Sequence, residues 1–282
     1  MTPDDYCQQK AAASGSSFYY SFLFLPPERR RAITAVYAYC REVDDVVDEV
    51  SDAAAAEATL DWWRQEVSRM FSGQPTHPVT RALQPFINSR PGVEFGISEE
   101  RLSAVLDGMQ VDLRQNRFLD YAALQRYAHL VAGVVGEMSA AIFGYEDSQT
   151  LQYAARLGLA LQLINIIRDV GDDARRGRIY LPLDEMQRFD VKAADVLGAR
   201  YVEGFVPLMR FQTERARTAY SDALATLPAV DRKAQRPGLM MGAIYSALLT
   251  EIERGNFQVL HQRIALTPLL KLWLAWRTWV FG

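Results

Sequence analysis

The chain has 282 residues, of which 49% are hydrophobic, and its formal net charge at pH 7 is −3. This length is close to the upper limit for a single hydrophobic core, and the composition is typical of a folded protein rather than a disordered one. The slightly negative charge argues against nucleic acid as a main partner. The two cysteines, Cys7 and Cys40, form no spaced framework and suit free thiols in a reducing cytoplasm.

Targeting and cofactor motifs are absent from the sequence. The N-terminal stretch MTPDDYCQQK has no basic region followed by an apolar one, so we expect no secretory signal and a cytoplasmic location. There is no GxGxxG fingerprint and no P-loop, so no nicotinamide cofactor is expected. The three histidines, His77, His129 and His261, are far apart, which argues against a zinc site.

Apolar residues recur at helical spacing along most of the chain, whereas the alternation typical of strands is scarce. Proline and glycine clusters separate the periodic stretches. In chain order, the predicted helices cover residues 27–50, 56–72, 78–90, 98–116, 120–144, 147–175, 192–226, 231–258 and 266–280. No linker rich in Gly, Ser or Pro divides the chain, so we predict a single all-α domain over residues 1–282.

The first acidic cluster lies in YAYCREVDDVVDE, residues 37–49. Four polar side chains of this stretch have spacings of i, i+4, i+7 and i+11 and would share one helix face: Tyr37, Arg41, Asp44 and Asp48. Carboxylates stacked in this way repel each other, so the pattern is not chosen for helix stability.

The second acidic cluster lies in LQLINIIRDVGDDARRGRIYLP, which begins at Leu161. Here the column consists of Asn165, Asp169 and Asp173 at i, i+4 and i+8, with Gln162 about one turn earlier. Gly171 interrupts the helix pattern, although a mid-helix glycine costs about 1 kcal/mol relative to alanine.

Both columns of oxygen ligands are embedded in apolar sequence. If they face each other across a cavity, two carboxylates about 6 Å apart repel by roughly 3 kcal/mol at an effective dielectric constant near 20. Oxygen ligands without nearby Cys or His favour Mg²⁺, which takes the rest of its shell from water and phosphate. The pattern therefore indicates an apolar phosphate ester as ligand, with Tyr37, Arg41 and Arg168 placed to hydrogen-bond a departing diphosphate.

Several features have more than one interpretation. One acidic cluster alone is more often a solvated helix face than a metal site. Gly133 and Gly136 suit either close helix packing or room for a substrate chain. The loop arginines suit either a solvated surface or a diphosphate cover: Arg175, Arg176 and Arg178. For His129, and for the aromatic residues between Phe18 and Phe24, a structural role is the favoured interpretation.

With these motifs in place, the sequence resembles the squalene/phytoene synthase family of head-to-head prenyl transferases. The matching segments occur in the family's order: SGSSFYYSFLFLPPERRRAITAVYAYCREVDDVVDE, YAHLVAGVVGEM, ALQLINIIRDVGDDARRGRIYLP and AIYSALLTEIERGNFQVLHQRI. Within the family, SGSSFYYSFLFLP and KLWLAWRTW are most similar to the bacterial presqualene diphosphate synthases of hopanoid biosynthesis.

The resemblance implies a helical bundle of the isoprenoid synthase type with a central apolar cavity. It also implies that two farnesyl diphosphates are condensed to presqualene diphosphate with the help of two or three Mg²⁺ ions. The implied metal ligands are Asp44, Asp48, Asn165, Asp169 and Asp173. The implied catalytic residues are Tyr37, Arg41, Asp44, Asp48, Asp169 and Asp173. The implied substrate-binding residues are Ser14, Ser17, Phe18, Tyr37, Arg41, Tyr127, Val131, Gly136, Gln162, Arg168, Tyr180, Tyr245 and Arg263.

At Ser14 the sequence departs from related dehydrosqualene synthases, which often have histidine there. Other products of the same family are the alternatives, namely phytoene, dehydrosqualene or squalene. A more distant alternative is a non-catalytic helical protein that binds lipid or serves in an assembly. Besides farnesyl diphosphate, the resemblance implies downstream isoprenoid enzymes as partners.

The C-terminal stretch TPLLKLWLAWRTWVFG is too short for a bilayer-spanning helix, which needs about 20 apolar residues. Its three tryptophans and two basic residues would suit a helix lying at the inner face of the cell membrane: Trp273, Trp276, Trp279, Lys271 and Arg277. The favoured interpretation is a terminal helix docked on the bundle.

Overall fold

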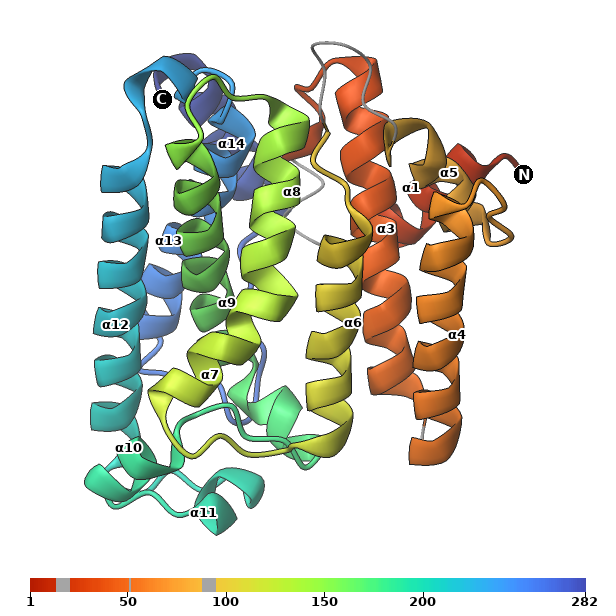
Figure 1. The fold of residues 1–282 in the computed structure, drawn as a ribbon. Helices are drawn as coiled ribbons and strands as arrows, with labels where there is room; N and C mark the ends of the chain where they lie inside the picture. The colour runs from red at the N-terminus through yellow and green to blue at the C-terminus, as the bar shows by residue number, and fades with distance from the viewer. Residues whose placement is uncertain (14–20, 51, 88–94) are drawn as a thin grey trace.

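The structure is a computed structural model that describes residues 1–13, 21–50, 52–87 and 95–282. These residues form an all-α bundle (Figure 1), and within them the only extended pairing is an isolated bridge between Arg117 and Ile179. The main helices are α1 (Pro3–Ala13), α3 (Pro27–Glu49), α4 (Ala53–Phe71), α5 (Pro78–Ile87), α6 (Glu99–Arg114), α7 (Tyr121–Ala128), α8 (Val134–Phe143), α9 (Gln149–Arg175), α10 (Leu183–Arg188), α11 (Ala193–Leu197), α12 (Phe205–Thr226), α13 (Arg236–Arg254) and α14 (Pro268–Phe281). The predicted all-α class is confirmed.

Helix α9 is the centre of one half of the bundle, where it packs against α8, α12 and α13. Helix α3 packs against α1, α5 and α6 in the other half. Both α3 and α9 run toward the end of the bundle drawn at the bottom of Figure 1, where α10 and α11 also lie. The C-terminal halves of α3 and α9, which carry the two acidic clusters, therefore lie at the same end of the molecule.

Buried apolar side chains form two clusters. One surrounds α9, α12 and α13 and includes Ile164 and Ile244, and the other surrounds α3, α4 and α6 and includes Val43 and Leu106. Val131 packs against both clusters, so the two halves meet beside it. That the whole chain is a single domain stays a prediction.

Glycines allow the central helices to approach closely. A Cβ atom at Gly136 of α8 would overlap the carbonyl oxygen of Ala154 in α9, which supports the close-packing interpretation of this residue. Gly171 has a similar reason, because a Cβ there would overlap the carbonyl oxygens of Val259 and Leu260. The mid-helix glycine thus lets the segment after α13 lie directly against α9.

The predicted helix over 192–226 is wrong in its first third. The short helix α11 ends at Leu197, Ala199 adopts a left-handed φ of 51°, and α12 begins only at Phe205. Gly204 lies so close to the Phe189 carbonyl that a side chain there would collide with it. The two glycines of LGARYVEG mark a loop that the apolar periodicity did not reveal.

Other boundaries also differ from the prediction. Helices α1 and α10 were not predicted, and the predicted helix over 120–144 is divided by a π-helical turn at His129–Gly133. A π turn inserts one residue into the helical ladder and rotates the following side chains, which periodicity counting does not detect.

The C-terminal helix α14 packs on α13, as the docked interpretation expects. Ala275 is its only fully buried residue, and the ring of Trp279 stacks on Phe24 with centroids 5.2 Å apart. Leu269 and Phe281 remain 80% and 77% exposed. Among the described helices, none combines the length and the apolar character needed to cross a bilayer.

Glu66 of α4 makes the fold sensitive to acid. Its fully buried carboxylate accepts hydrogen bonds from the backbone N–H groups of Thr76 and His77 and from the hydroxyl of Thr80. Burial raises the pKa of Glu66, but these bonds and Arg69 outweigh it and lower the pKa to about 2. The contribution of Glu66 to stability is therefore complete above its ordinary pKa and is lost as the pH falls from about 4.5 toward 2.

We expect Glu66→Gln to lower the free energy of unfolding at pH 7 by about 3 kcal/mol, because the shift spans about 2.5 pKa units at 1.36 kcal/mol each. The difference from the wild type should shrink below pH 4.5, as measured by urea unfolding at a series of pH values. The control is Glu57→Gln, which removes an exposed carboxylate from the same helix. An equal loss at pH 3 and pH 7 would contradict the assignment.

Candidate active site

The C-terminal half of α3 presents Arg41, Asp44 and Asp48 to a cavity of about 380 Å³. The Arg41 guanidinium binds Asp44 and Asp45 at 2.6 Å each. The helical spacing read from the sequence is therefore realised, and these side chains line one cavity.

The second column, on α9, lines the same cavity from the opposite side. Its cavity-lining members are Gln162, Asn165, Arg168, Asp169 and Asp173. The Arg168 guanidinium donates to both oxygens of Asp169, and Arg263 donates to Asp169 at 2.9 Å. The structure thus brings both acidic clusters together, and we call this space the acid cavity.

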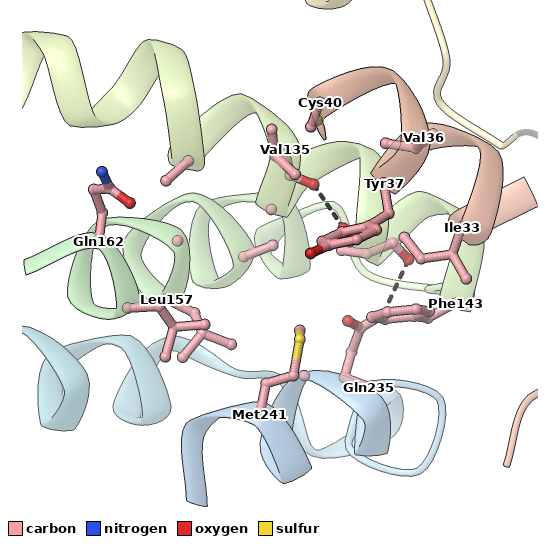
Figure 2. A pocket seen from close by; sticks show the side chains of 18 of the residues that line it. Ile33, Val36, Tyr37, Cys40, Val135, Phe143, Leu157, Gln162, Gln235 and Met241 are labelled. Carbon is pink, nitrogen blue, oxygen red and sulfur yellow. Dashed lines mark hydrogen bonds between the residues drawn. The ribbon is translucent and has the colours of Figure 1, made fainter. Parts of the chain in front are cut away.

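An apolar cavity adjoins the acid cavity, and Gln162 and Asn165 line both. Figure 2 shows it between α3, α8, α9 and α13, with Gln162 at one end and Phe143 and Gln235 toward the other. The predicted substrate-binding residues Tyr37, Val131 and Gly136 line it as well. The acid cavity therefore lies beside an apolar cavity.

Arginines after α9 join the two clusters. Arg178 donates to Asp48 at 2.7 Å and to the Val47 carbonyl at 2.9 Å, and Arg176 lies 3.5 Å from Asp48. Both side chains line the acid cavity, whereas Arg175 binds Asp172 and the Leu260 carbonyl instead. Of the two interpretations offered for this loop, the structure favours a cover for an anion in the case of Arg176 and Arg178.

Asp112 is a residue of the acid cavity that the sequence reasoning missed. It lies in the last turn of α6, and its two oxygens accept the hydroxyls of Tyr127 at 2.6 Å and Tyr180 at 2.7 Å. The rings of these tyrosines stack with centroids 5.5 Å apart. In the stretch DGMQVDLRQ no second carboxylate lies three or four residues from Asp112, so no acidic column marked it.

The remaining predicted site residues lie in different parts of the structure. Tyr245 is buried against Arg168, and Arg263 lines the acid cavity. His129 lines neither the acid nor the apolar cavity, and its ring lies against Gly133. Ser14, Ser17 and Phe18 lie outside the described residues.

The electrostatics of the acid cavity show an excess of negative charge. Burial raises the pKa of Asp44 to about 6, with a further rise from neighbouring acids. Burial also raises the pKa of Asp173 to about 8, and the charges of Asp169 and Asp112 contribute. Burial opposes ionisation of Asp169 too, but Arg168 and Arg263 hold the pKa of that carboxyl below its ordinary value.

The donor set fits a hard cation. In the part of the chain that the structure describes, no three His, Cys, Asp or Glu side chains converge closely enough to hold a metal as they lie, since most of the acids are paired with arginines. However, the side-chain oxygen of Asn165 is buried without a hydrogen-bond partner. A buried amide oxygen in need of a positive partner, beside carboxylates with raised pKa values, is the chemistry that Mg²⁺ accepts.

A family model described as squalene/phytoene synthase matches residues 11–269 of the chain. A phytoene synthase from Arthrospira platensis is 35% identical over 272 residues, covering 92% of this chain and 86% of that protein. Among solved structures, a dehydrosqualene synthase in complex with ligand superposes with a TM-score of 0.87 at 25% identity, over 99% of this chain and 96% of that one. The squalene synthase HpnC from Alicyclobacillus acidocaldarius reaches a TM-score of 0.79 at 25% identity, over 90% and 94% of the two chains.

We expect Mg²⁺ and inorganic diphosphate together to raise the Tm of the wild type by several degrees, and more than either alone. Ligands that bind only the folded state stabilise it by about 2.7 kcal/mol at a hundredfold excess over Kd. Asp169→Asn should abolish most of this shift, because it removes a charge that faces the cavity. Asp107→Asn, at an exposed carboxylate of α6 that pairs with Arg64, is the matched control and should keep it. An unchanged shift in Asp169→Asn would contradict the metal assignment.

Proposed function

Because the chain belongs to the squalene/phytoene synthase family, we propose that it joins two allylic prenyl diphosphates head to head in the paired cavities. The observation that carries this proposal is that the acid cavity, lined by both acidic clusters, shares the lining residues Gln162 and Asn165 with an apolar cavity. A diphosphate suits the first space and a prenyl chain suits the second.

Ionisation of the allylic C–O bond requires that the leaving diphosphate be stabilised. Arg41, Arg168, Arg178 and Arg263 present guanidinium groups to the acid cavity, and their fork geometry matches phosphate oxygens. Mg²⁺ held by Asp44, Asp48, Asn165, Asp169 and Asp173 would add Lewis-acid stabilisation of the departing charge. These five residues are the proposed metal ligands. The proposed catalytic residues are Tyr37, Arg41, Asp44, Asp48, Asp169 and Asp173.

The carbon chemistry that follows needs a dry site. The allylic cation of one substrate adds to the C2–C3 double bond of the other, and loss of one proton closes a cyclopropane ring. The products are a cyclopropylcarbinyl diphosphate, inorganic diphosphate and a proton. Apolar side chains from α3, α8, α9 and α13 exclude water that would otherwise trap the cation.

Two products are the leading candidates. The curated relatives favour phytoene, made from two geranylgeranyl diphosphates, because the protein of Arthrospira platensis and a 34% identical protein of Synechocystis are both named phytoene synthases. The motifs SGSSFYYSFLFLP and KLWLAWRTW favour the other candidate, in which farnesyl diphosphate is used and the reaction stops at presqualene diphosphate. The comparisons support the phytoene alternative better than this sequence-based expectation.

Incubation with farnesyl diphosphate and with geranylgeranyl diphosphate, each supplied alone with Mg²⁺, separates these candidates by mass spectrometry of the products. A C40 hydrocarbon from the longer substrate identifies a phytoene synthase. A C30 cyclopropyl diphosphate from the shorter one, unchanged by reduced nicotinamide, identifies a presqualene diphosphate synthase. Binding of prenyl diphosphate without turnover would instead favour a non-catalytic lipid-binding protein.

Asp44→Ala and Asp169→Ala should each lower turnover at least about a thousandfold, since each removes a proposed ligand of the ion that stabilises the leaving group. The measurement is release of inorganic diphosphate at saturating substrate. Asp107→Asn should retain the wild-type rate. Near-normal turnover in either alanine variant would refute the assignment.

A further inference from the structure

Among the described residues that line the acid cavity, Asp112 is the carboxylate that belongs to neither acidic cluster. Only 8% of Asp112 is exposed, and each of its oxygens accepts one tyrosine hydroxyl. The three residues come from separate segments, since Tyr127 lies on α7 and Tyr180 lies just after α9. A single carboxylate thus fixes two hydroxyl groups at the boundary of the site.

A carboxylate in this place is costly. Burial disfavours the ionised form of Asp112, and Asp44, Asp48 and Asp173 lie close enough for their charges to add to this cost. The charge of Arg178 offsets only part of it. Purely structural anchoring of two tyrosines would be cheaper with a neutral acceptor such as a backbone carbonyl or an amide. We therefore look for a role of the Asp112 charge in the chemistry of the site.

The direction of the hydrogen bonds supplies that reason. An ionised carboxylate only accepts, so both tyrosines must donate their single O–H to Asp112. Their oxygen lone pairs then point away from Asp112, and both side chains line the acid cavity. A phenol oxygen presented in this way can accept the proton released on ring closure while its own O–H proton passes to the Asp112 carboxylate. It can also lie against an allylic cation, and it cannot donate its hydrogen to either.

We propose that Asp112 is a positioning residue that holds Tyr127 and Tyr180 with their oxygen lone pairs facing the acid cavity. Through them it serves the carbon–carbon bond-forming step, and in this respect the inference rests on the proposed function. Asp112 is not itself a metal ligand in this assignment. Its effect should therefore fall on turnover rather than on the binding of diphosphate.

The test uses Asp112→Asn in the full chain. The amide keeps the size of the side chain but replaces one acceptor oxygen with a donor, so one tyrosine loses its fixed orientation. We expect kcat to fall by about thirtyfold or more, since small misplacements of reacting groups cost about a hundredfold. The KM for prenyl diphosphate should stay within about threefold of the wild-type value. The Tm shift given by Mg²⁺ with inorganic diphosphate should stay within about 2 °C of the wild-type shift. Asp107→Asn, on the same helix, is the matched control.

A double-mutant cycle then shows whether Asp112 acts through a tyrosine. The double variant Asp112→Asn with Tyr127→Phe should have a kcat within about threefold of the slower single variant, because the two changes disturb the same arrangement. Multiplicative losses would overturn the proposal. The proposal would also be overturned if Asp112→Asn lost the Tm shift given by Mg²⁺ with diphosphate along with its turnover, because that result would identify Asp112 as a ligand.

The same cycle measured on Tm without any ligand needs neither substrate nor product. Non-additive Tm losses of Asp112→Asn and Tyr127→Phe are expected, and additive losses would refute the contact on which the inference depends. If Asp112→Asn does not fold, both double-mutant cycles are measured with Asp112→Glu and Tyr180→Phe instead. Wild-type protein that binds prenyl diphosphate but forms no product would refute the proposed function alone, while the ligand-free cycle still decides the contact.

Discussion

Charge crowding at one end of the bundle is the constraint on which the rest of the site depends. Six aspartates and five arginines line the acid cavity, so the arginines nearly neutralise the acids within the folded chain. This pairing offsets the mutual repulsion of the carboxylates that α3 and α9 bring together. Cations that took over the carboxylates would leave these guanidinium groups available to diphosphate oxygens.

The second constraint is that the acid cavity lies beside an apolar one. Gln162 and Asn165, on adjacent turns of α9, line both spaces. Their amides provide polar contacts at the boundary without adding charge to the apolar side, where a charge would pay a large desolvation penalty. A substrate with a diphosphate head and a hydrocarbon tail matches this division. The glycines of α8 and α9 keep the helices close enough to enclose the apolar walls.

The sequence predicted the parts of the site that helical periodicity controls. Asp44 with Asp48, and Asn165 with Asp169 and Asp173, repeat at spacings that place them on one face of a long helix, and the structure brings both faces to one cavity. Asp112 escaped because no second carboxylate lies at helical spacing from it, and its partners Tyr127 and Tyr180 come from other segments.

Tertiary contacts account for the other differences between prediction and structure. The role of Arg178 depends on where a loop folds back onto α3, which no local pattern encodes. The break between α11 and α12 escaped as well, because Gly204 is required by contact with the distant Phe189 carbonyl rather than by neighbouring residues.

The division of the site also explains why membership of the family leaves more than one product open. In the proposed reaction the reacting carbons lie beside the acid cavity, and the prenyl chains extend into the apolar cavity toward Phe143 and Gln235 (Figure 2). Gln235 is almost fully buried and donates to the carbonyls of Ala140 and Gly144, so it braces the C-terminal end of α8. If the reaction runs in this orientation, side-chain bulk at this far end would limit the length of the prenyl chain, whereas the charged end would control ionisation. Residues that carry the chemistry can therefore stay the same among relatives while the length of the accepted chain changes.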